Sequence, residues 1–202
     1  MLTVHFTDAW HKTFAGGHVG ILMMGPVDNG RRPTALDEHK LTLEAEIREK
    51  YGSLTRAELQ ESAVLKAYKT YYKKFNKTYH IQLQPESVLH KGKSLPAVSP
   101  LVDACFAAEL ETHLLTASHD VDKLVTPVTI DASNGREALM MMNGKRQQIK
   151  ANDMMMTDGE GVVCTVIYGQ DKRTPVTTAT KRVIYVTYAP VGVGESDVVW
   201  HH

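Results

Sequence analysis

The sequence predicts an α+β fold in which helices pack on a mixed or antiparallel sheet. Helical patterns dominate the first half of the chain, strand patterns dominate from about residue 125, and hairpin-type turns join the strands. A regular alternation of strands and long helices would indicate a doubly wound parallel sheet, and the sequence lacks it. The chain has 202 residues, 43% of them hydrophobic, and only weak linker signals, so we expect residues 1–202 to form a single domain with one substantial core.

The helical half is marked by apolar residues three or four positions apart and by signals for helix starts. Thr55-x-x-Glu58 is a capping box, in which each side chain bonds the backbone amide of the other residue and opens a helix. Ser99-Pro100 opens another helix, because proline fits the first turn, where its missing N–H is not needed. We expect strands at residues 2–7 and 18–24, and helices at 34–50, 55–75, 85–89 and 99–113.

The second half is marked by short β-branched and apolar runs separated by turn residues. Asn143-Gly144 between two such runs is typical of a two-residue hairpin, because both residues tolerate the positive φ angles that this turn requires. We expect strands at residues 125–130, 139–142, 146–149, 154–156, 162–168 and 182–188.

The composition narrows the function classes. The 23 basic and 23 acidic residues balance, whereas a protein that coats nucleic acid non-specifically is usually basic overall. We expect no membrane partner, since there is no apolar run of about 18 residues and no signal-peptide pattern. Cys105 and Cys164 lie in apolar runs, which favours buried thiols in a cytoplasmic protein, although a bridge between them stays open at this point.

No cofactor or metal is expected. Gly16-Gly17-x-x-Gly20 is followed by a strand pattern, which indicates a turn, because a phosphate loop leads into a helix N-terminus. His113, His119, Asp120 and Asp122 can all bind metals, but their spacing matches no recognised zinc pattern.

The most informative stretch runs from Leu95 to Leu124. It predicts an apolar helix followed by a short extended segment that ends in His119-Asp120. Small and apolar side chains would bury one face of this helix, while Glu109 and the terminal histidine and aspartate need water or partners. Titratable groups gathered at a helix end indicate a pocket there.

The chain resembles the B3/B4 domain of the bacterial phenylalanyl-tRNA synthetase beta subunit and its freestanding relatives. The resemblance rests on motifs in a fixed order over about residues 55–190, with residues 1–54 adding N-terminal strands and a helix to the same domain. The motifs are Pro85-x-Ser87-x-Leu89, Ser99-Pro100-Leu101-Val102-Asp103, Asp120-Val121-Asp122-Lys123-Leu124, Gly159-Glu160-Gly161-Val162-Val163, Arg173-Thr174-Pro175-Val176-Thr177 and Thr180.

This resemblance implies a trans-acting editing hydrolase that deacylates a mischarged aminoacyl-tRNA and binds the tRNA acceptor end. Cys105 stands where the synthetase pattern has a pocket threonine, and Ala117 where it has a histidine. The glutamate of the pattern maps near Val186 or Thr187, and Cys105-Phe106 replaces the Tyr-Asn pair common in freestanding members.

Ester hydrolysis needs an oriented water and stabilisation of the oxyanion, and it does not require a protein nucleophile. We therefore expect three catalytic residues, Glu109, His119 and Asp120, which would orient the water or the substrate amino group. The expected substrate-binding residues are Cys105, Ala117, Asp153, Arg173 and Thr174, with Arg173 able to hold a carboxylate or phosphate through two hydrogen bonds. The expected tRNA-binding residues are Lys66, Lys69, Lys73, Lys91 and Lys93.

Structural interpretations stand beside each of these roles. The lysines are also typical of a solvated helix face, Asp120 and Asp122 can cap a turn, and Glu109 can have a structural partner. Two other functions therefore remain open. The first is a non-catalytic tRNA-binding module. The second is a protein whose pocket recognises a free amino acid or a similar small molecule.

Overall fold

The fold is α+β, as predicted, in a computed structural model that describes residues 2–59, 61–79, 88 and 94–202. The five-stranded sheet has the order β1 (Val4–Phe6), β4 (Val128–Ala132), β7 (Met154–Asp158), β8 (Gly161–Thr165) and β9 (Gly169–Gln170). The three-stranded sheet has the order β2 (His18–Met24), β10 (Val183–Ala189) and β3 (Thr116–Asp120), and β5 (Ala138–Met140) pairs with β6 (Arg146–Gln148). Since β1 runs parallel to β4 and the other pairs are antiparallel, the five-stranded sheet is mixed.

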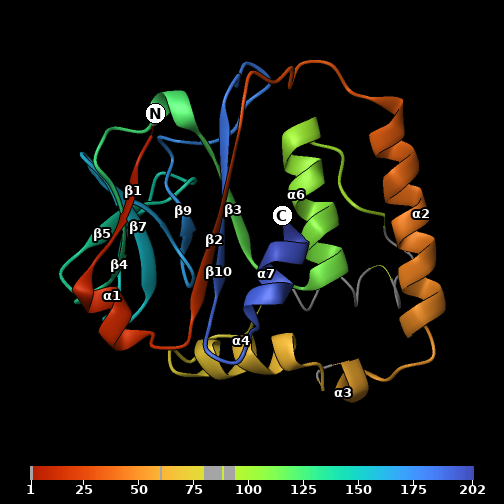
Figure 1. The fold of residues 1–202 in the computed structure, drawn as a ribbon, viewed down its shortest axis with the longest axis horizontal. Coiled ribbons are helices and arrows are strands. Elements are labelled where there is room, and N and C mark those ends of the chain that lie inside the picture. Colours follow the sequence, from red (N-terminus) through yellow and green to blue (C-terminus); the bar gives the residue numbers. More distant parts are fainter. Residues whose placement is uncertain (1, 60, 80–87, 89–93) are drawn as a thin grey trace.

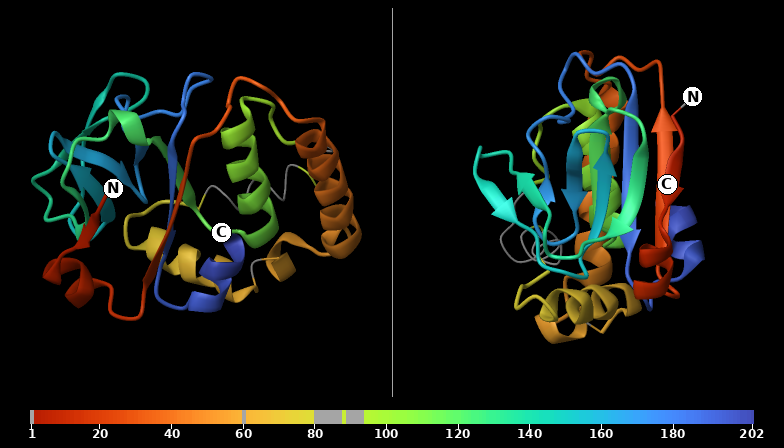
Figure 2. Two further views of the ribbon diagram at one scale, coloured as in Figure 1. Left: turned by 45° about the horizontal axis from the view of Figure 1, so that its top comes forward. Right: turned by 90° about the vertical axis from the view of Figure 1, so that its left-hand side faces the viewer.

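The helices lie mainly on one side of the three-stranded sheet. They are α1 (Asp8–Thr13), α2 (Thr34–Tyr51), α3 (Arg56–Leu59), α4 (Ala63–Lys73), α6 (Pro100–Thr112) and α7 (Glu195–His201), with a 3-10 turn at Val121–Lys123. Figure 1 shows the order of the layers: five-stranded sheet, three-stranded sheet, α6 with α7, and then α2. The views in Figure 2 show α4 crossing the lower end of both sheets.

The main core lies between the two larger sheets, and β10 shows why. All seven residues of β10 are buried, because the strand is covered on both faces. Ile184 and Val186 belong to the core with the five-stranded sheet, while Val183 and Tyr185 pack with α6. A separate apolar cluster joins α2 to α6.

The predicted helix over 99–113 is confirmed as α6. Ser99 precedes it and Pro100 occupies its first turn. His113 has φ 62°, a left-handed conformation that ends the helix and turns the chain into β3. The apolar α6 and the polar segment after it are therefore fixed side by side.

A buried ion cluster holds α6 against α2. Asp103 is fully buried, and its Oδ2 lies 2.8 Å from Lys40 Nζ and 2.6 Å from an Arg32 guanidinium nitrogen. The Val98 amide donates to Asp103 Oδ1 over 2.8 Å, and Lys40 also donates to the Pro96 carbonyl over 2.7 Å. The Val-Asp motif of the sequence is thus an anchor for the start of α6.

The prediction of one continuous helix over 55–75 is wrong, because the structure has two separate helices there, α3 and α4. The capping box forms, with the Thr55 amide donating to Glu58 over 2.7 Å, but it opens only the short α3. Ser62 then caps α4, because its hydroxyl accepts from the Leu65 amide over 3.2 Å. A serine that can bond the backbone favours a new helix start over a continued helix.

Most predicted strands are confirmed with shifted ends. The hairpin at Asn143-Gly144 joins β5 to β6 as expected. β4 begins at Val128, since Pro127 has no N–H for the ladder. The strand expected at 162–168 ends at Thr165, whose hydroxyl accepts from the Tyr168 amide and closes a turn before β9. Helix α7 was not predicted, and the helix expected at 85–89 lies outside the described residues apart from Val88.

Candidate active site

A cavity of about 430 Å³ runs along the edge of β3 that β10 leaves open, and we call it the β3-edge cavity. Helix α6 supplies one wall, and β8, β9 and the segment after them supply the other. Its lining includes Cys105, Phe106, Glu109, Ala117, Ser118, Gln170 and Val176. Its volume is in the range of small-molecule sites.

The floor of the β3-edge cavity is a row of outward-facing backbone groups. The ladder bonds of β3 to β10 run through alternate residues, as the bond from the Tyr188 amide to the Leu115 carbonyl shows, so Thr116, Ser118 and Asp120 face outward. The Thr116 amide donates to Glu109 over 2.9 Å, and the Asp120 amide donates to the Thr174 carbonyl over 3.0 Å. The Ser118 amide has no acceptor among the described residues, which leaves a hydrogen-bond donor on the cavity floor.

Glu109 is the carboxylate of the β3-edge cavity. Its side chain is 3% exposed, and its Oε1 is fixed by the Thr116 amide. Burial, together with the charge of Glu109, raises the pKa of the neighbouring Cys105 thiol well above its usual value. Cys105 therefore stays protonated at neutral pH and is a poor nucleophile.

Two more neutral groups line the cavity, from Cys164 of β8 and Tyr188 of β10. Burial raises the pKa of Cys164 and of Tyr188 above their usual ranges. The Tyr188 hydroxyl has no hydrogen-bond partner among the described residues and lies beside the Cys164 thiol. Neither group supplies a charge at neutral pH.

His119 lies in the core instead of in the cavity lining. It is fully buried, and its Nδ1 lies 2.8 Å from the Thr174 hydroxyl, which in turn donates to Asp171 over 2.6 Å. Burial lowers the pKa of His119 to about 3, so the ring is neutral. Thr174 is also fully buried, and these hydrogen bonds fix it behind the cavity wall.

Asp120 caps the turn after β3. One oxygen accepts from the Asp122 amide over 3.1 Å, and the other accepts from the Thr180 hydroxyl over 2.8 Å. Lys123 lies 3.5 Å from the same carboxylate. Asp120 therefore caps a turn, which is the structural role that the sequence left open, and it does not line the cavity.

Arg173 is surrounded by acids. It makes two hydrogen bonds to Asp158, of 2.9 and 3.1 Å, and lies 3.1 Å from Asp171 and 3.2 Å from Glu160. These carboxylates neutralise the guanidinium that was expected to hold a substrate anion. Arg173 thus ties the β7–β8 turn to the wall of the β3-edge cavity.

Asp153 lies at the start of β7 and is also fully buried. Its carboxylate accepts from the Tyr71 hydroxyl over 2.7 Å and from the Ile167 amide over 3.2 Å. Burial raises its pKa to about 6, with these hydrogen bonds opposing the rise. It joins α4 to the five-stranded sheet and does not itself line the cavity.

The lysines of α4 lie on its exposed face. Lys66, Lys69 and Lys73 are exposed, and Lys66 pairs with Glu61 at 2.6 Å. The buried face of the same helix reaches the β3-edge cavity, because the Tyr68 hydroxyl accepts from the Leu115 amide and donates to the Tyr188 carbonyl. Lys91 and Lys93 lie outside the described residues.

The structure thus brings together three of the expected site residues, Cys105, Glu109 and Ala117, in one cavity. His119, Asp120, Asp153, Arg173 and Thr174 do not line this cavity. Sequence reasoning missed the outward amide of Ser118 and the side chain of Gln170, which donates to the Ser118 carbonyl over 3.0 Å. These two groups can be identified only from the register of β3 against β10, and no local sequence pattern indicates that register.

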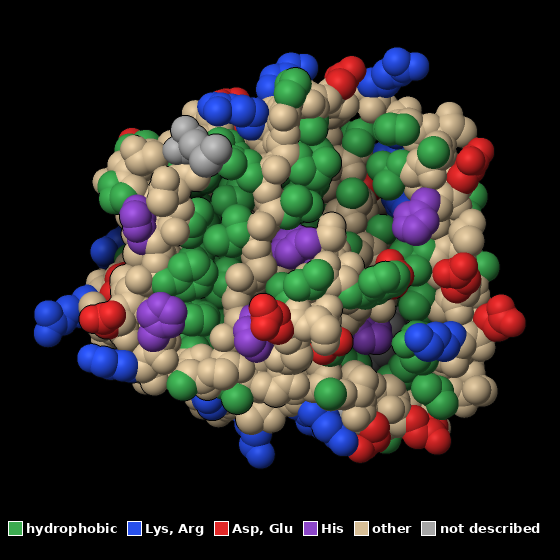
Figure 3. Space-filling model, viewed as in Figure 1, with side chains coloured by type: hydrophobic (Ala, Val, Ile, Leu, Met, Phe, Trp, Pro, Cys, Tyr) green, Lys and Arg blue, Asp and Glu red, His purple; other side chains and the backbone are tan. Residues whose placement is uncertain are grey.

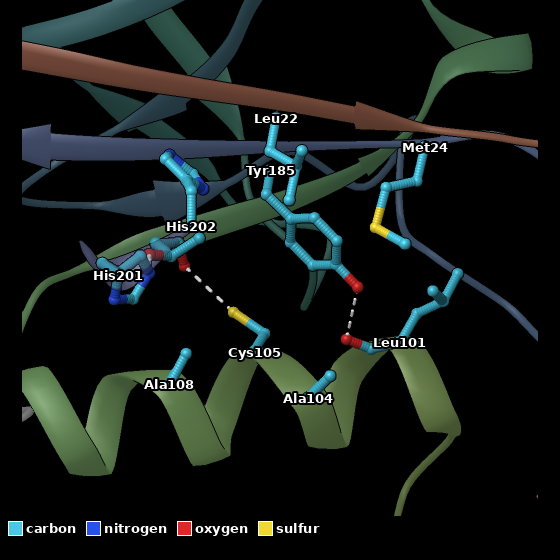
Figure 4. Close-up of a pocket in the computed structure, with 10 residues that line it drawn as sticks. Leu22, Met24, Leu101, Ala104, Cys105, Ala108, Tyr185, His201 and His202 are labelled. Atoms are coloured by element: carbon cyan, nitrogen blue, oxygen red, sulfur yellow. Dashed lines mark hydrogen bonds between the residues drawn. The ribbon is translucent and has the colours of Figure 1, made fainter. Parts of the chain in front are cut away.

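A second cavity lies on the other face of the three-stranded sheet, beneath α6, and we call it the β10-face cavity. It has a volume of about 230 Å³ and a mainly apolar lining. Figure 4 shows the residues that line it. Its polar groups pair internally: the Tyr185 hydroxyl donates to the Leu101 carbonyl over 2.8 Å, and both His201 ring nitrogens lie within 2.7 Å of threonine hydroxyls. Cys105 and Thr116 line both cavities and separate them.

The described part of the chain offers neither a metal cluster nor a membrane-spanning helix. No group of three or more metal-binding side chains occurs among its residues, and its helices include none long and apolar enough to cross a bilayer. Cys105 and Cys164 are both free and buried, which resolves the disulfide question left open by the sequence.

Comparison with known proteins identifies the class. The profile of the B3/4 domain family matches residues 64–192, and the chain belongs to that family. Among solved structures, it is similar to an N-terminal fragment of the phenylalanyl-tRNA synthetase beta subunit from Pyrococcus horikoshii, at 14% identity and a TM-score of 0.48. The match covers 99% of this chain and 46% of that one, so this chain spans about half of that fragment. No curated protein matches the sequence.

Proposed function

We propose that this protein is a trans-acting editing hydrolase, which removes a wrongly attached amino acid from tRNA in the β3-edge cavity. The proposal rests chiefly on one observation. A buried carboxylate, Glu109, and an outward amide, that of Ser118, which has no acceptor within the described part of the chain, face the same mainly apolar cavity. Membership of the B3/4 domain family supports the same assignment.

The two polar groups match the two polar ends of an aminoacyl ester. The amino group of the substrate is a cation near neutral pH and would pair with Glu109. A carboxylate has about four lone-pair positions, and on Glu109 the Thr116 amide donates to one oxygen, Oε1. The ester carbonyl would accept from the Ser118 amide, and the apolar lining around Phe106 and Val176 would receive the amino-acid side chain.

The hydrolysis proceeds by direct attack of water. The neutral Cys105 thiol argues against a covalent intermediate. Water oxygen attacks the ester carbonyl, the oxyanion gains the Ser118 hydrogen bond, and the ribose oxygen leaves with a proton. The neighbouring ribose hydroxyl relays that proton from the water, so the products are a free amino acid and a tRNA with both hydroxyls restored.

The other expected residues act as supports in this proposal. His119 and Asp120 would fix the ends of β3, and Asp153, Arg173 and Thr174 would hold the opposite wall. Ala117 would leave space for the substrate. The exposed lysines of α4, Lys66, Lys69 and Lys73, and the predicted contacts Lys91 and Lys93 would approach the phosphates of the acceptor end.

Deacylation assays over a panel of mischarged tRNAs test this function. Glu109→Gln keeps an oxygen for the Thr116 amide but removes the charge, so we expect kcat/KM to fall by about 10- to 100-fold, the value of about 1.5–3 kcal/mol for a hydrogen bond to a charged group. Glu111→Gln, an exposed change on the same helix, should stay within about twofold of the wild type. No hydrolysis of any panel member by folded wild-type protein would refute the proposal.

A binding-only function is the alternative, and one observation favours it. Among the described residues that line the β3-edge cavity, the titratable groups besides Glu109 are the thiols of Cys105 and Cys164 and the hydroxyl of Tyr188, and none of these lining residues is a histidine. Salt-dependent tRNA binding without ester hydrolysis would support a tRNA-binding module. Thermal stabilisation by a free amino acid, with no response to tRNA, would instead support a small-molecule receptor.

A further inference from the structure

Strand β2 is an open edge of the three-stranded sheet. Its neighbour β10 directs the backbone groups of Tyr188 toward β3, so β10 pairs with β2 through the residues at alternate positions. The N–H and C=O groups of Val19, Ile21 and Met23 consequently face away from β10. β2 contains no charged residue and no proline, and a long apolar edge of this kind is a ready template for another strand.

The lower half of this edge forms the floor of a groove between two helices. Helix α1 supplies Trp10 and His11 to one wall, and α7 supplies Val198 and Val199 to the other, together with His202, which follows α7. We call this hollow of about 580 Å³ the β2 groove.

The upper half of the edge continues the groove with apolar side chains. Ile21 and Met23 are 37% and 44% exposed, and Phe6 of the neighbouring edge strand β1 is 37% exposed. In Figure 3, hydrophobic side chains occupy the middle of this face, while most charged side chains lie around its rim. An apolar strip bordered by charge is typical of a docking surface.

Trp10 supplies a separate indication of a ligand. Its ring lines the β2 groove and is 6% exposed, yet the indole N–H has no acceptor among the described residues. A buried donor without an acceptor costs about 1–3 kcal/mol, and the Trp10 side chain would have to shift for a partner carbonyl to accept this hydrogen bond.

We propose that the β2 edge is a peptide-binding site, where one extended, apolar segment of a partner protein adds as a strand. Its backbone would pair with Val19, Ile21 and Met23. Its alternate side chains would contact either Phe6 and Trp10 or the face of α7. This is strand addition, in which the backbone supplies affinity and the groove supplies selectivity.

A second copy of this chain does not fit the same edge in the two-fold pairing centred on Ile21. Val198 lies only 2.4 Å from the position that a Cβ on Gly20 would occupy, so α7 sits directly over β2. A two-fold pairing centred on Ile21 would place the two Gly20 residues at a diagonal separation of about 7–8 Å. Packed helices need about 8–10 Å between axes, and the two α7 helices would collide.

Amide hydrogen exchange measured by NMR tests the proposal with an internal control. The probe is a blocked peptide of alternating valine and threonine with the seven-residue length of β2. We expect it to slow exchange at Val19, Ile21 and Met23 by at least tenfold, while Gly20 and Leu22, already paired with β10, stay unchanged. The same peptide with alternate backbone nitrogens methylated should protect none of them.

Two variants complete the test. Ile21→Lys should weaken binding of the valine–threonine peptide more than tenfold. Met24→Lys should leave it intact, because Met24 is similarly exposed, at 42%, but lies on the other face and is paired with β10. No protection at millimolar peptide would overturn the proposal. Protection of the same amides by dimer formation without peptide would also overturn it, because a second copy would then be the occupant.

Discussion

Removing the Asp103 carboxylate should destabilise the fold severely, because it leaves a buried charge behind. Lys40 is only 6% exposed and would retain the Pro96 carbonyl as its partner in this cluster. Breaking a buried ion pair costs about 3–5 kcal/mol. For a chain of this length, Asp103→Ala should lower Tm by roughly 6–20 °C, at about 2–4 °C per kcal/mol.

Urea denaturation of a small set of variants measures this cost. Asp103→Leu combined with Lys40→Met should recover most of the loss, since apolar side chains of similar volume replace buried pairs well. Asp37→Ala is the matched control: the Arg32–Asp37 pair is 32% and 46% exposed, so its loss should cost less than about 1 kcal/mol. The reasoning fails if Asp103→Ala costs under about 1 kcal/mol, or if the double variant is no more stable than the single one.

Two further predictions concern buried groups. The pKa of Asp153 is raised from 3.8 to about 6 in the folded state, so the folded protein binds the proton more tightly than the unfolded chain, and the free energy of unfolding should fall by about 2–3 kcal/mol as pH rises from 4 to 7. Urea titrations should show that this component disappears in Asp153→Asn, and an unchanged pH profile would contradict it. Tyr68→Phe should cost about 1–3 kcal/mol, because it leaves the Leu115 amide and a buried carbonyl unpaired, whereas Tyr188→Phe should cost under about 0.5 kcal/mol. Equal losses in the two tyrosine variants would refute this contrast.

Local signals predicted the elements that local chemistry determines. Ser99-Pro100 marks the start of α6, and Asn143-Gly144 marks the turn between β5 and β6, because each motif fixes backbone angles by itself. The break before α4 was missed, since apolar spacing continues across Ser62 and only its cap separates the helices. The parallel pairing of β1 with β4 joins residues more than 120 positions apart, and no local pattern contains it.

The candidate site was predicted only in part for the same reason. Glu109 and Cys105 follow from one helix face, and that helix was predicted well. Arg173 looked like an anion-binding group, but its partners Asp158 and Asp171 come from other segments that the fold brings together. The outward amide of Ser118 depends on strand register, which the packing of both sheet faces determines.

The most direct test is NMR titration with a non-hydrolysable aminoacyl-adenosine analogue, in which an amide replaces the ester. If the β3-edge cavity binds the aminoacyl end of tRNA, the amide resonance of Ser118 should shift downfield and saturate, and Glu109→Gln should weaken the titration about tenfold or more. Saturating shifts that map to the β10-face cavity, or no shift at Ser118, would contradict the account.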